Sequence, residues 1–388
     1  MIELSREEKE VRKAARQFAL GEFPRQALTA DRTETFDQTL WRQASELGFV
    51  GIHLPEEYDG GGFGFSGLCL VTEEFWRVDP GLGQAILSTT FGSEMLLLFG
   101  DEDQKRTYLP PLTCGRAVMA TAITEPQAGS DVAAVKTRAE LEGGQWVVNG
   151  SKMFITNGSL ATWVLTVCLT DPQAQDPHQR HSIILIPAET PGFTATKLKG
   201  KMGIRASDTA ELSFKAVRVP EANLIGQRGR GFEQLMAFLN HTRLHIGAQG
   251  VGLGQGCLDR SLTQVKGRRQ FGRPLAKFQT VQFQLAEMAT QLEAARSLVY
   301  RASRLVDKGG MDHALVAMDK WYSARMAVEA SELAVQLHGG YGYMDETDVQ
   351  RFYRDAKILE IYEGVREIEK QIIAQALLGG RACSWDVS

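Results

Sequence analysis

The sequence predicts an α+β protein with an α-helical domain over residues 1–118, a β domain over 119–226 and a second α-helical domain over 227–388. Helical periodicity fills both ends of the chain, whereas alternating apolar and polar residues fill its middle. No repeated β-α-β alternation is present, which argues against a doubly wound sheet. With 388 residues, 43% of them hydrophobic, the chain can bury the core of two or three domains.

The first domain opens with a capping box, in which Ser5 and Glu8 satisfy each other's backbone amides. The amphipathic helix that follows should stop near Gly21 and Pro24. Further helical patterns predict helices over residues 36–47, 66–78, 84–98 and 101–109, with an exposed loop at 54–62.

After the proline pair at 110–111 the pattern changes to short alternating stretches separated by glycine turns. We expect strands over residues 136–141, 146–149, 163–169, 182–187 and 211–219. Long helical patterns then return, over residues 231–269, 279–307 and 312–338, followed by two short helices that flank Gly364.

Composition excludes several classes of function. The net charge of −4 argues against nucleic acid as a partner. No apolar run has the length of a membrane span and the N-terminus resembles no targeting segment, so we expect a cytoplasmic protein. Five scattered cysteines without C-x-x-C spacing speak against a disulfide or zinc framework.

Two patterns look functional but are not. The glycine run at residues 250–256 resembles a dinucleotide loop, yet a helical pattern leads into it where that motif needs a strand. It is better explained as a small-residue helix face that lets a neighbouring helix approach closely. His241 and His245 could share a helix face, but no third ligand is evident, and we predict no metal site.

Glu363 is the strongest catalytic candidate. Apolar residues recur at helical spacing around it, at positions 358, 361, 365, 368 and 372, and Gly364 interrupts the run. A glycine beside a carboxylate lets a ligand approach the backbone closely. On its own, the pattern favours a corner between helices with a solvated glutamate.

Three other stretches of the sequence contain candidate functional residues. Residues 122–131, AITEPQAGSD, offer hydroxyls and free backbone amides suited to a polar cofactor edge or a phosphate. Residues 153–156 place an aromatic ring beside a hydroxyl at a strand end, and residues 336–342, QLHGGYG, place a glycine turn after a long helix. Each is weak alone.

Together these stretches resemble the acyl-CoA dehydrogenase family along essentially the whole chain. The matching segments are residues 122–134, 268–272, 336–355 and 361–364, in the family's order and spacing. The resemblance implies an N-terminal α-helical domain, a middle β-barrel-like domain and a C-terminal four-helix bundle. It also implies bound FAD, an acyl-CoA substrate, electron-transfer flavoprotein as the acceptor, and a homotetramer built as a dimer of dimers.

The resemblance also implies the site residues. Those expected at the flavin ring and ribityl chain are Thr121, Ile123, Thr124, Gly129, Ser130, Phe154, Ile155 and Thr156. Those expected at the FAD of a partner subunit are Arg268, Phe271, Phe278, Gln279, Gln336, Leu337, Gly339 and Gly340, whereas Val365 and Glu367 would touch FAD in their own subunit. Substrate contacts are expected from Ser130, Asn240, Arg243, Tyr362 and Gly364.

Glu363 matches the family's general base, and Thr242 stands where some members place that glutamate. We expect Glu363 to remove the α-proton while the β-hydrogen leaves as hydride to flavin N5, giving a trans-2-enoyl-CoA. Apolar neighbours Ile361 and Val365, together with the acyl chain of the substrate, should exclude water and raise the pKa of Glu363.

Departures from the family leave some points open. Val365 replaces a frequent threonine, Gln127 a glycine and Phe154 a tryptophan. Leu82 stands where glutaryl-type members carry an arginine, which predicts a monocarboxylic acyl group. Alternatives are an enoyl-CoA reductase, a dehydrogenase of carrier-protein thioesters, and a non-catalytic flavoprotein scaffold.

Overall fold

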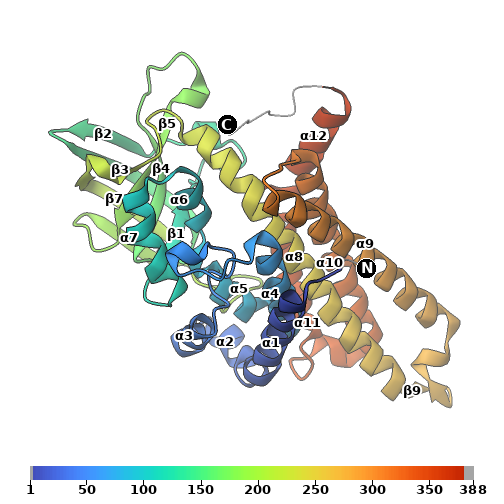
Figure 1. The fold of residues 1–388 in the computed structure, drawn as a ribbon. Helices are drawn as coiled ribbons and strands as arrows, with labels where there is room; N and C mark the ends of the chain where they lie inside the picture. The colour runs from blue at the N-terminus through green and yellow to red at the C-terminus, as the bar shows by residue number, and fades with distance from the viewer. Residues whose placement is uncertain (1–2, 380–388) are drawn as a thin grey trace.

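The computed structural model describes residues 3–379 and shows helical regions at both ends of the chain with a sheet formed by its middle (Figure 1). The predicted α+β fold is confirmed. The end of the predicted third domain, residues 380–388 with Cys383, lies outside the described residues.

The N-terminal region is helical up to Thr113. Its helices are α1 (Arg6–Glu22), α2 (Ala27–Thr33), α3 (Gln38–Glu46), α4 (Gly64–Val78), α5 (Pro80–Leu87), α6 (Ser93–Phe99) and α7 (Glu102–Thr113). The predicted capping box is present: Glu8 N donates to Ser5 Oγ over 3.2 Å, and Ser5 N donates to Glu8 Oε2 over 2.8 Å.

The single helix predicted over residues 84–98 is wrong. The chain forms α5, a 3-10 turn at Ser88–Thr90 and then α6, because Gly92 adopts φ 121°. A Cβ at Gly92 would lie 2.7 Å from Thr121 Oγ1, which itself donates to the Phe91 carbonyl over 3.1 Å. The sequence periodicity hides this break because both halves are buried, and only the packing against strand β1 shows it.

By length and composition, residues 80–99 could pass for a membrane span, but 78% of the most apolar 18-residue window within them is buried inside the protein. The break between α5 and α6 divides it further. Its apolar character is therefore that of a core segment.

The middle region forms one eight-stranded sheet. Its strands are β1 (Met119–Ala122), β2 (Arg138–Glu142), β3 (Gln145–Thr156), β4 (Trp163–Leu169), β5 (His181–Pro187), β6 (Phe193–Lys197), β7 (Thr209–Pro220) and β8 (Leu224–Ile225). They lie in the order β6-β7-β3-β2-β4-β5-β8, and β1 pairs with β4 in parallel. Strand β6 was not predicted from the sequence, because none of its residues is fully buried.

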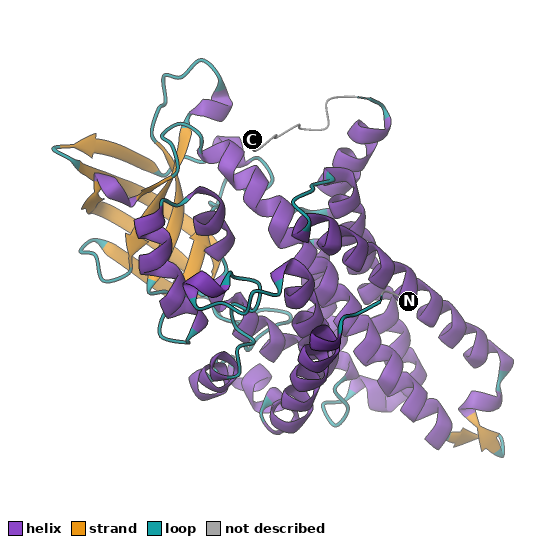
Figure 2. Cartoon of the chain, viewed as in Figure 1, coloured by secondary structure: helices purple, strands orange, loops and turns teal. Residues whose placement is uncertain are grey.

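The C-terminal region consists of long helices. They are α8 (Gly231–Gly267), α9 (Gln279–Asp307), α10 (His313–His338), α11 (Val349–Ala356) and α12 (Arg366–Leu377). Figure 2 shows that the short hairpin of β9 (Arg269–Gln270) and β10 (Arg273–Pro274) lies at the far end of these helices, well away from the sheet.

The glycine run at residues 250–256 lies inside α8, which confirms that it is not a dinucleotide loop. A Cβ at Gly250 would lie 2.6 Å from the Ser323 carbonyl of α10, and one at Gly254 would lie 2.7 Å from Met326 Sδ. The glycines therefore let α8 and α10 approach closely, as predicted.

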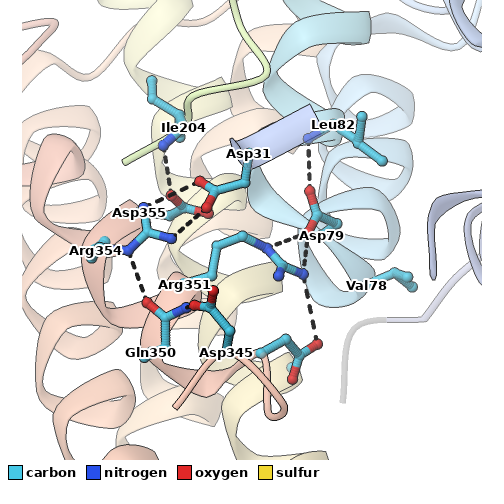
Figure 3. Close-up of polar contacts among 12 residues, drawn as sticks. Asp31, Val78, Asp79, Leu82, Ile204, Asp345, Gln350, Arg351, Arg354 and Asp355 are labelled. Atoms are coloured by element: carbon cyan, nitrogen blue, oxygen red, sulfur yellow. Dashed lines mark hydrogen bonds and ion pairs between the residues drawn. The ribbon is translucent and has the colours of Figure 1, made fainter. Parts of the chain in front are cut away.

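Ion pairs join α11 to the rest of the molecule (Figure 3). Arg354 donates to the carboxylate of Asp31 on α2 over 2.7 and 3.1 Å, and Arg351 pairs with Asp79, the N-cap of α5. The next residue, Asp355, accepts from Ile204 N of the β-domain loop over 2.6 Å. One short helix thus holds all three regions together immediately before the chain reaches Glu363.

Candidate active site

Glu363 lies in the turn between the 3-10 helix Lys357–Glu360 and α12. Its backbone is left-handed, with φ 56°, and Gly364 follows with φ 103°. Non-glycine residues rarely adopt this conformation, and they are enriched at functional sites. A Cβ on residue 364 would collide with Glu369 Oε1, so the predicted break at Gly364 is confirmed and glycine is required there.

The Glu363 side chain is held by α8. Thr242 Oγ1 donates to Glu363 Oε2 over 2.6 Å. Burial raises the pKa of Glu363 above its ordinary value, and the Thr242 hydrogen bond and the charges of Arg243 and Lys320 offset part of that rise. A glutamate with a raised pKa is a stronger general base at neutral pH.

Ile361, which was predicted to exclude water from Glu363, does not do so. Ile361 is 51% exposed and does not shield the carboxylate. The turn at residues 361–364 ends the helical periodicity on which the prediction was based. Side chains of α8 and α10 surround Glu363 instead.

Arg243 and Asn240 lie directly beside the Glu363 turn. Arg243 Nε donates to the Glu363 carbonyl over 3.3 Å, and Nη1 donates to Asn240 Oδ1 over 2.9 Å. The same guanidinium pairs with Glu369 at 3.0 Å, and its side chain is only 6% exposed. These contacts show how Arg243 supports the turn, while its contact with CoA stays a prediction.

Tyr362 is linked through successive hydrogen bonds to two buried glutamine side chains, Gln249 and Gln84, which were not predicted from the sequence. Its hydroxyl donates to Gln249 Oε1, and Gln249 Nε2 donates to Gln84 Oε1 over 2.9 Å. Thr242 and Gln249 are seven residues apart on α8 and so lie on one helix face. A polar link from α5 through α8 to Tyr362 therefore lies next to the candidate base.

The polar loop at residues 122–131 is fixed by Glu125. Its carboxylate accepts from Thr137 N and Oγ1 over 2.8 and 2.6 Å, from Lys136 N over 2.8 Å, and from the buried Lys152 Nζ over 3.0 Å. Burial opposes ionisation, but the Lys152 charge and these hydrogen bonds lower the pKa of Glu125 to about 2. The Glu125 carboxylate thus anchors the loop to the buried Lys152 and to residues 136 and 137, while Gly129 and Ser130 stay exposed.

Phe154 also has unusual geometry. It is 68% exposed with φ 61°, at an irregularity in the pairing of β3 with β7. Ile155 is buried, whereas Thr156, Ile123 and Thr124 are half-buried and Thr121 is buried on β1. An aromatic face presented in a strained conformation is a feature of ligand-binding sites.

The other predicted cofactor residues gather at the far end of α8. Arg268, Gln336, Leu337, Gly339 and Gly340 line a concavity of about 600 Å³. Phe278 precedes Gln279, the first residue of α9, and Phe271 on the adjoining hairpin is 92% exposed.

One continuous helix separates the two groups. Arg268 follows Arg243 by 25 residues, which at 1.5 Å per residue is about 38 Å along α8. The concavity and Glu363 therefore form two separate sites on one chain.

The chemistry of both groups fits FAD. An arginine beside two glycines, Gly339 at φ 61° and Gly340 with open space where a Cβ would be, suits a diphosphate. Phe154 and the free Gly129–Ser130 edge suit a flat polar ring. Fold and site together are those of a flavin-dependent oxidoreductase.

Family models match almost the entire chain. They are the acyl-CoA dehydrogenase N-terminal domain over residues 5–116, the middle domain over 120–217 and the C-terminal domain over 229–378. The chain belongs to the acyl-CoA dehydrogenase family, so it is an FAD-dependent oxidoreductase acting on acyl-CoA.

Two bacterial relatives are similar over nearly their full length. An acyl-CoA dehydrogenase of Bacillus subtilis is 41% identical over 98% of this chain and 100% of its own. An acryloyl-CoA reductase (NADH) of Anaerotignum propionicum is 40% identical over 97% of this chain and 95% of its own.

Two solved structures share the fold. Butyryl-CoA dehydrogenase from Megasphaera elsdenii superposes with a TM-score of 0.94, at 34% identity over 97% of this chain and 100% of its own. A chain from the structure of the electron transferring flavoprotein of Acidaminococcus fermentans also superposes with a TM-score of 0.94, at 37% identity over 97% of this chain and 99% of its own.

Proposed function

We propose that this enzyme converts an acyl-CoA thioester into its trans-2-enoyl-CoA, with Glu363 as the base that removes the α-proton. One observation carries the proposal: Glu363 lies in a left-handed turn with its carboxylate held by Thr242 and its pKa raised by burial. Each pKa unit between the weakly acidic α-carbon and the base costs about 1.36 kcal/mol, so raising the pKa of the base reduces the barrier.

The backbone of the same turn can stabilise the enolate that forms. In the described part of the chain, the Glu363 N–H has no hydrogen-bond acceptor. A free N–H beside the base can donate to the thioester carbonyl as negative charge builds on its oxygen. The Arg243 and Lys320 contacts to the carbonyls of residues 363 and 364 keep the turn oriented for this role.

FAD, when bound, supplies the acceptor for the hydride that leaves the β-carbon. Phe154, Thr156 and the Gly129–Ser130 edge would hold its ring, and the first-turn amides of α12, from Val365 to Glu367, would contact it in the same subunit. Val365 makes no side-chain cap to the first turn of α12.

We propose that the second site meets FAD of another subunit. Its separation of about 38 Å from Arg243 along α8 supports this, since one cofactor with its ring beside Glu363 would not reach it. Tyr343 is 84% exposed and Phe271 92% exposed near this site, as expected of a surface that a partner covers. A homotetramer built as a dimer of dimers accounts for such sharing.

Glu363→Gln tests the proposal. We expect the purified variant to retain the visible flavin spectrum but not to lose its absorbance when acyl-CoA is added anaerobically, because an amide cannot take the α-proton. Glu332→Gln, an exposed glutamate on α10, is the matched control and should bleach normally. Normal bleaching in Glu363→Gln would exclude this residue as the base.

The substrate class is tested with a panel of acyl-CoAs on the native enzyme. We propose a monocarboxylic acyl group. Leu82 stands where glutaryl-type members carry an arginine, and because it is buried and apolar it offers no cation for a distal carboxylate. Faster bleaching by glutaryl-CoA than by butyryl- or octanoyl-CoA would contradict this.

We propose electron-transfer flavoprotein as the electron acceptor, which the likeness to a chain in a structure of such a flavoprotein supports. The similarity to an acryloyl-CoA reductase favours a second candidate, reduction of an enoyl-CoA by the same residues. NADH oxidation that depends on an enoyl-CoA, measured against acyl-CoA oxidation with electron-transfer flavoprotein, distinguishes the two.

A further inference from the structure

A group of buried charges lies behind the Glu363 turn, and its carboxylate, Glu369, has no part in the reaction proposed above. Glu369, in the first turns of α12, is fully buried and its carboxylate lies 3.0 Å from Arg243 Nε. Lys320 of α10, also fully buried, donates from Nζ to the Gly364 carbonyl. Burying three charges costs free energy unless they compensate one another, so such a group calls for an explanation.

The group is in direct contact with the turn that carries the base. Any Cβ on residue 364 would collide with Glu369 Oε1 and lie 3.3 Å from Arg243 Nη2. Arg243 also donates to the Glu363 carbonyl over 3.3 Å, so both carbonyls of the Glu363–Gly364 pair are held by this cluster. The left-handed turn at Glu363 is thus in contact with Glu369, Arg243 and Lys320.

We propose that Glu369 is a positioning residue for Glu363: it fixes the left-handed turn and neutralises Arg243 and Lys320, the two cations that face the base. This role rests on the proposed function of Glu363. Without the Glu369 carboxylate, both cations would act on Glu363 unopposed and make it a weaker base.

The other charged groups around these carboxylates are compatible with this role. Glu363 is faced by Thr242 and Arg243 of α8, Lys320 of α10 and Glu94 of α6. Glu369 is faced by Arg243, Lys320 and Glu363, and it acts in turn on the neighbouring buried Asp319.

The pKa shifts of Glu369 and Lys320 are in the directions expected for this positioning role. Burial raises the pKa of Glu369 to about 7, against the opposing effect of Arg243 and Lys320, and burial lowers the pKa of Lys320 to about 8. As pH rises through about 7, Glu369 gains its charge and offsets the two cations. Glu363 and Glu369 should therefore titrate as a coupled pair in two steps.

Two variants of the holoenzyme test the inference, because they should act in opposite directions. In Glu369→Gln we expect the acid limb of the pH dependence of flavin reduction to move down by about one pH unit and the plateau rate to fall. In Lys320→Met, which removes one of the opposing cations, the acid limb should move up. Glu332→Gln serves again as the control with equal loss of charge at an exposed site.

A direct titration separates this inference from the proposed reaction. In protein labelled with ¹³C at the glutamate carboxyl carbons, the Glu363 signal is the one lost in Glu363→Gln. It should titrate in two steps in the native enzyme and in a single step at lower pH in Glu369→Gln. An unchanged Glu363 titration in Glu369→Gln would overturn the inference even if the reaction is as proposed, whereas a shifted titration with no bleaching by any acyl-CoA would overturn the reaction alone.

Discussion

The contact between Thr242 and Glu363 shows how one side chain adjusts another. At 2.6 Å the threonine hydroxyl donates to the carboxylate that we propose as the base. A hydrogen bond to the ionised form lowers a pKa, so Thr242 limits the rise that burial causes. The hydroxyl thus favours the ionised form of the base, while burial makes it a stronger base than an exposed glutamate.

Thr242→Val should raise the pKa of Glu363, because it removes that donor without changing the shape of the side chain. We expect the acid limb of flavin reduction to move up by about one pH unit, measured by stopped-flow absorbance. Thr242→Ser keeps the hydroxyl and should leave the limb in place. Equal profiles for the valine and serine variants would show that the hydrogen bond has no influence.

Among the elements, the turn from Ile361 to Val365 depends most on its local conformation. Two consecutive residues with positive φ cannot belong to a regular helix, and Gly364 has no room for a Cβ. The turn therefore places Glu363 opposite α8 only because residue 364 is glycine.

Gly364→Ala should be strongly destabilising and should slow flavin reduction, because it adds a collision with Glu369 to the strain of a positive φ. Gly48→Ala is the control: Gly48 has φ 77° and nothing within 4 Å of its missing Cβ. Conformational strain alone should cost the control about 1–2 kcal/mol of unfolding free energy. Thermal unfolding of both variants would measure the difference, and equal losses would mean that the collision is relieved without cost.

Across the molecule, α11 joins regions that are far apart in the chain. Arg354 contacts Asp31 of the first region, and Asp355 accepts from Ile204 of the second (Figure 3). Arg354 also donates to the Met202 carbonyl of the second region. The chain then runs directly to the Glu363 turn, so the position of the base depends on how all three regions meet.

Arg354→Met should lower the free energy of unfolding by about 3 kcal/mol, because it leaves the buried Asp31 carboxylate without its partner. Arg325→Met removes an exposed arginine paired with Glu329 and should cost less than about 1 kcal/mol. Melting temperatures of the two holoenzymes provide the comparison. A similar small change in both would mean that α11 does not hold the regions together.

Local sequence patterns were enough for much of this protein. Short-range patterns predicted the fold class, the capping box at Ser5 and the small-residue face at residues 250–256, because each depends on residues near in the chain. The structure showed that α10 is the helix that packs against this face. The burial of Lys320 could also have been predicted from the sequence. Lys320 lies four positions from the buried Val316 and Ala324 on one face of α10, where a lysine is unusual.

The tertiary structure alone decided the break at Gly92, the exposure of Ile361 and the grouping of Thr242, Arg243, Lys320 and Glu369 around the base. These residues come from three helices, α8, α10 and α12, and are spread over positions 242 to 369, so no periodicity relates them. Periodicity records which face of an element is buried, whereas the pKa of a buried carboxylate depends on which charges other elements bring to it. The amino-acid order therefore identified Glu363 as the candidate, and packing determined the environment in which it would act.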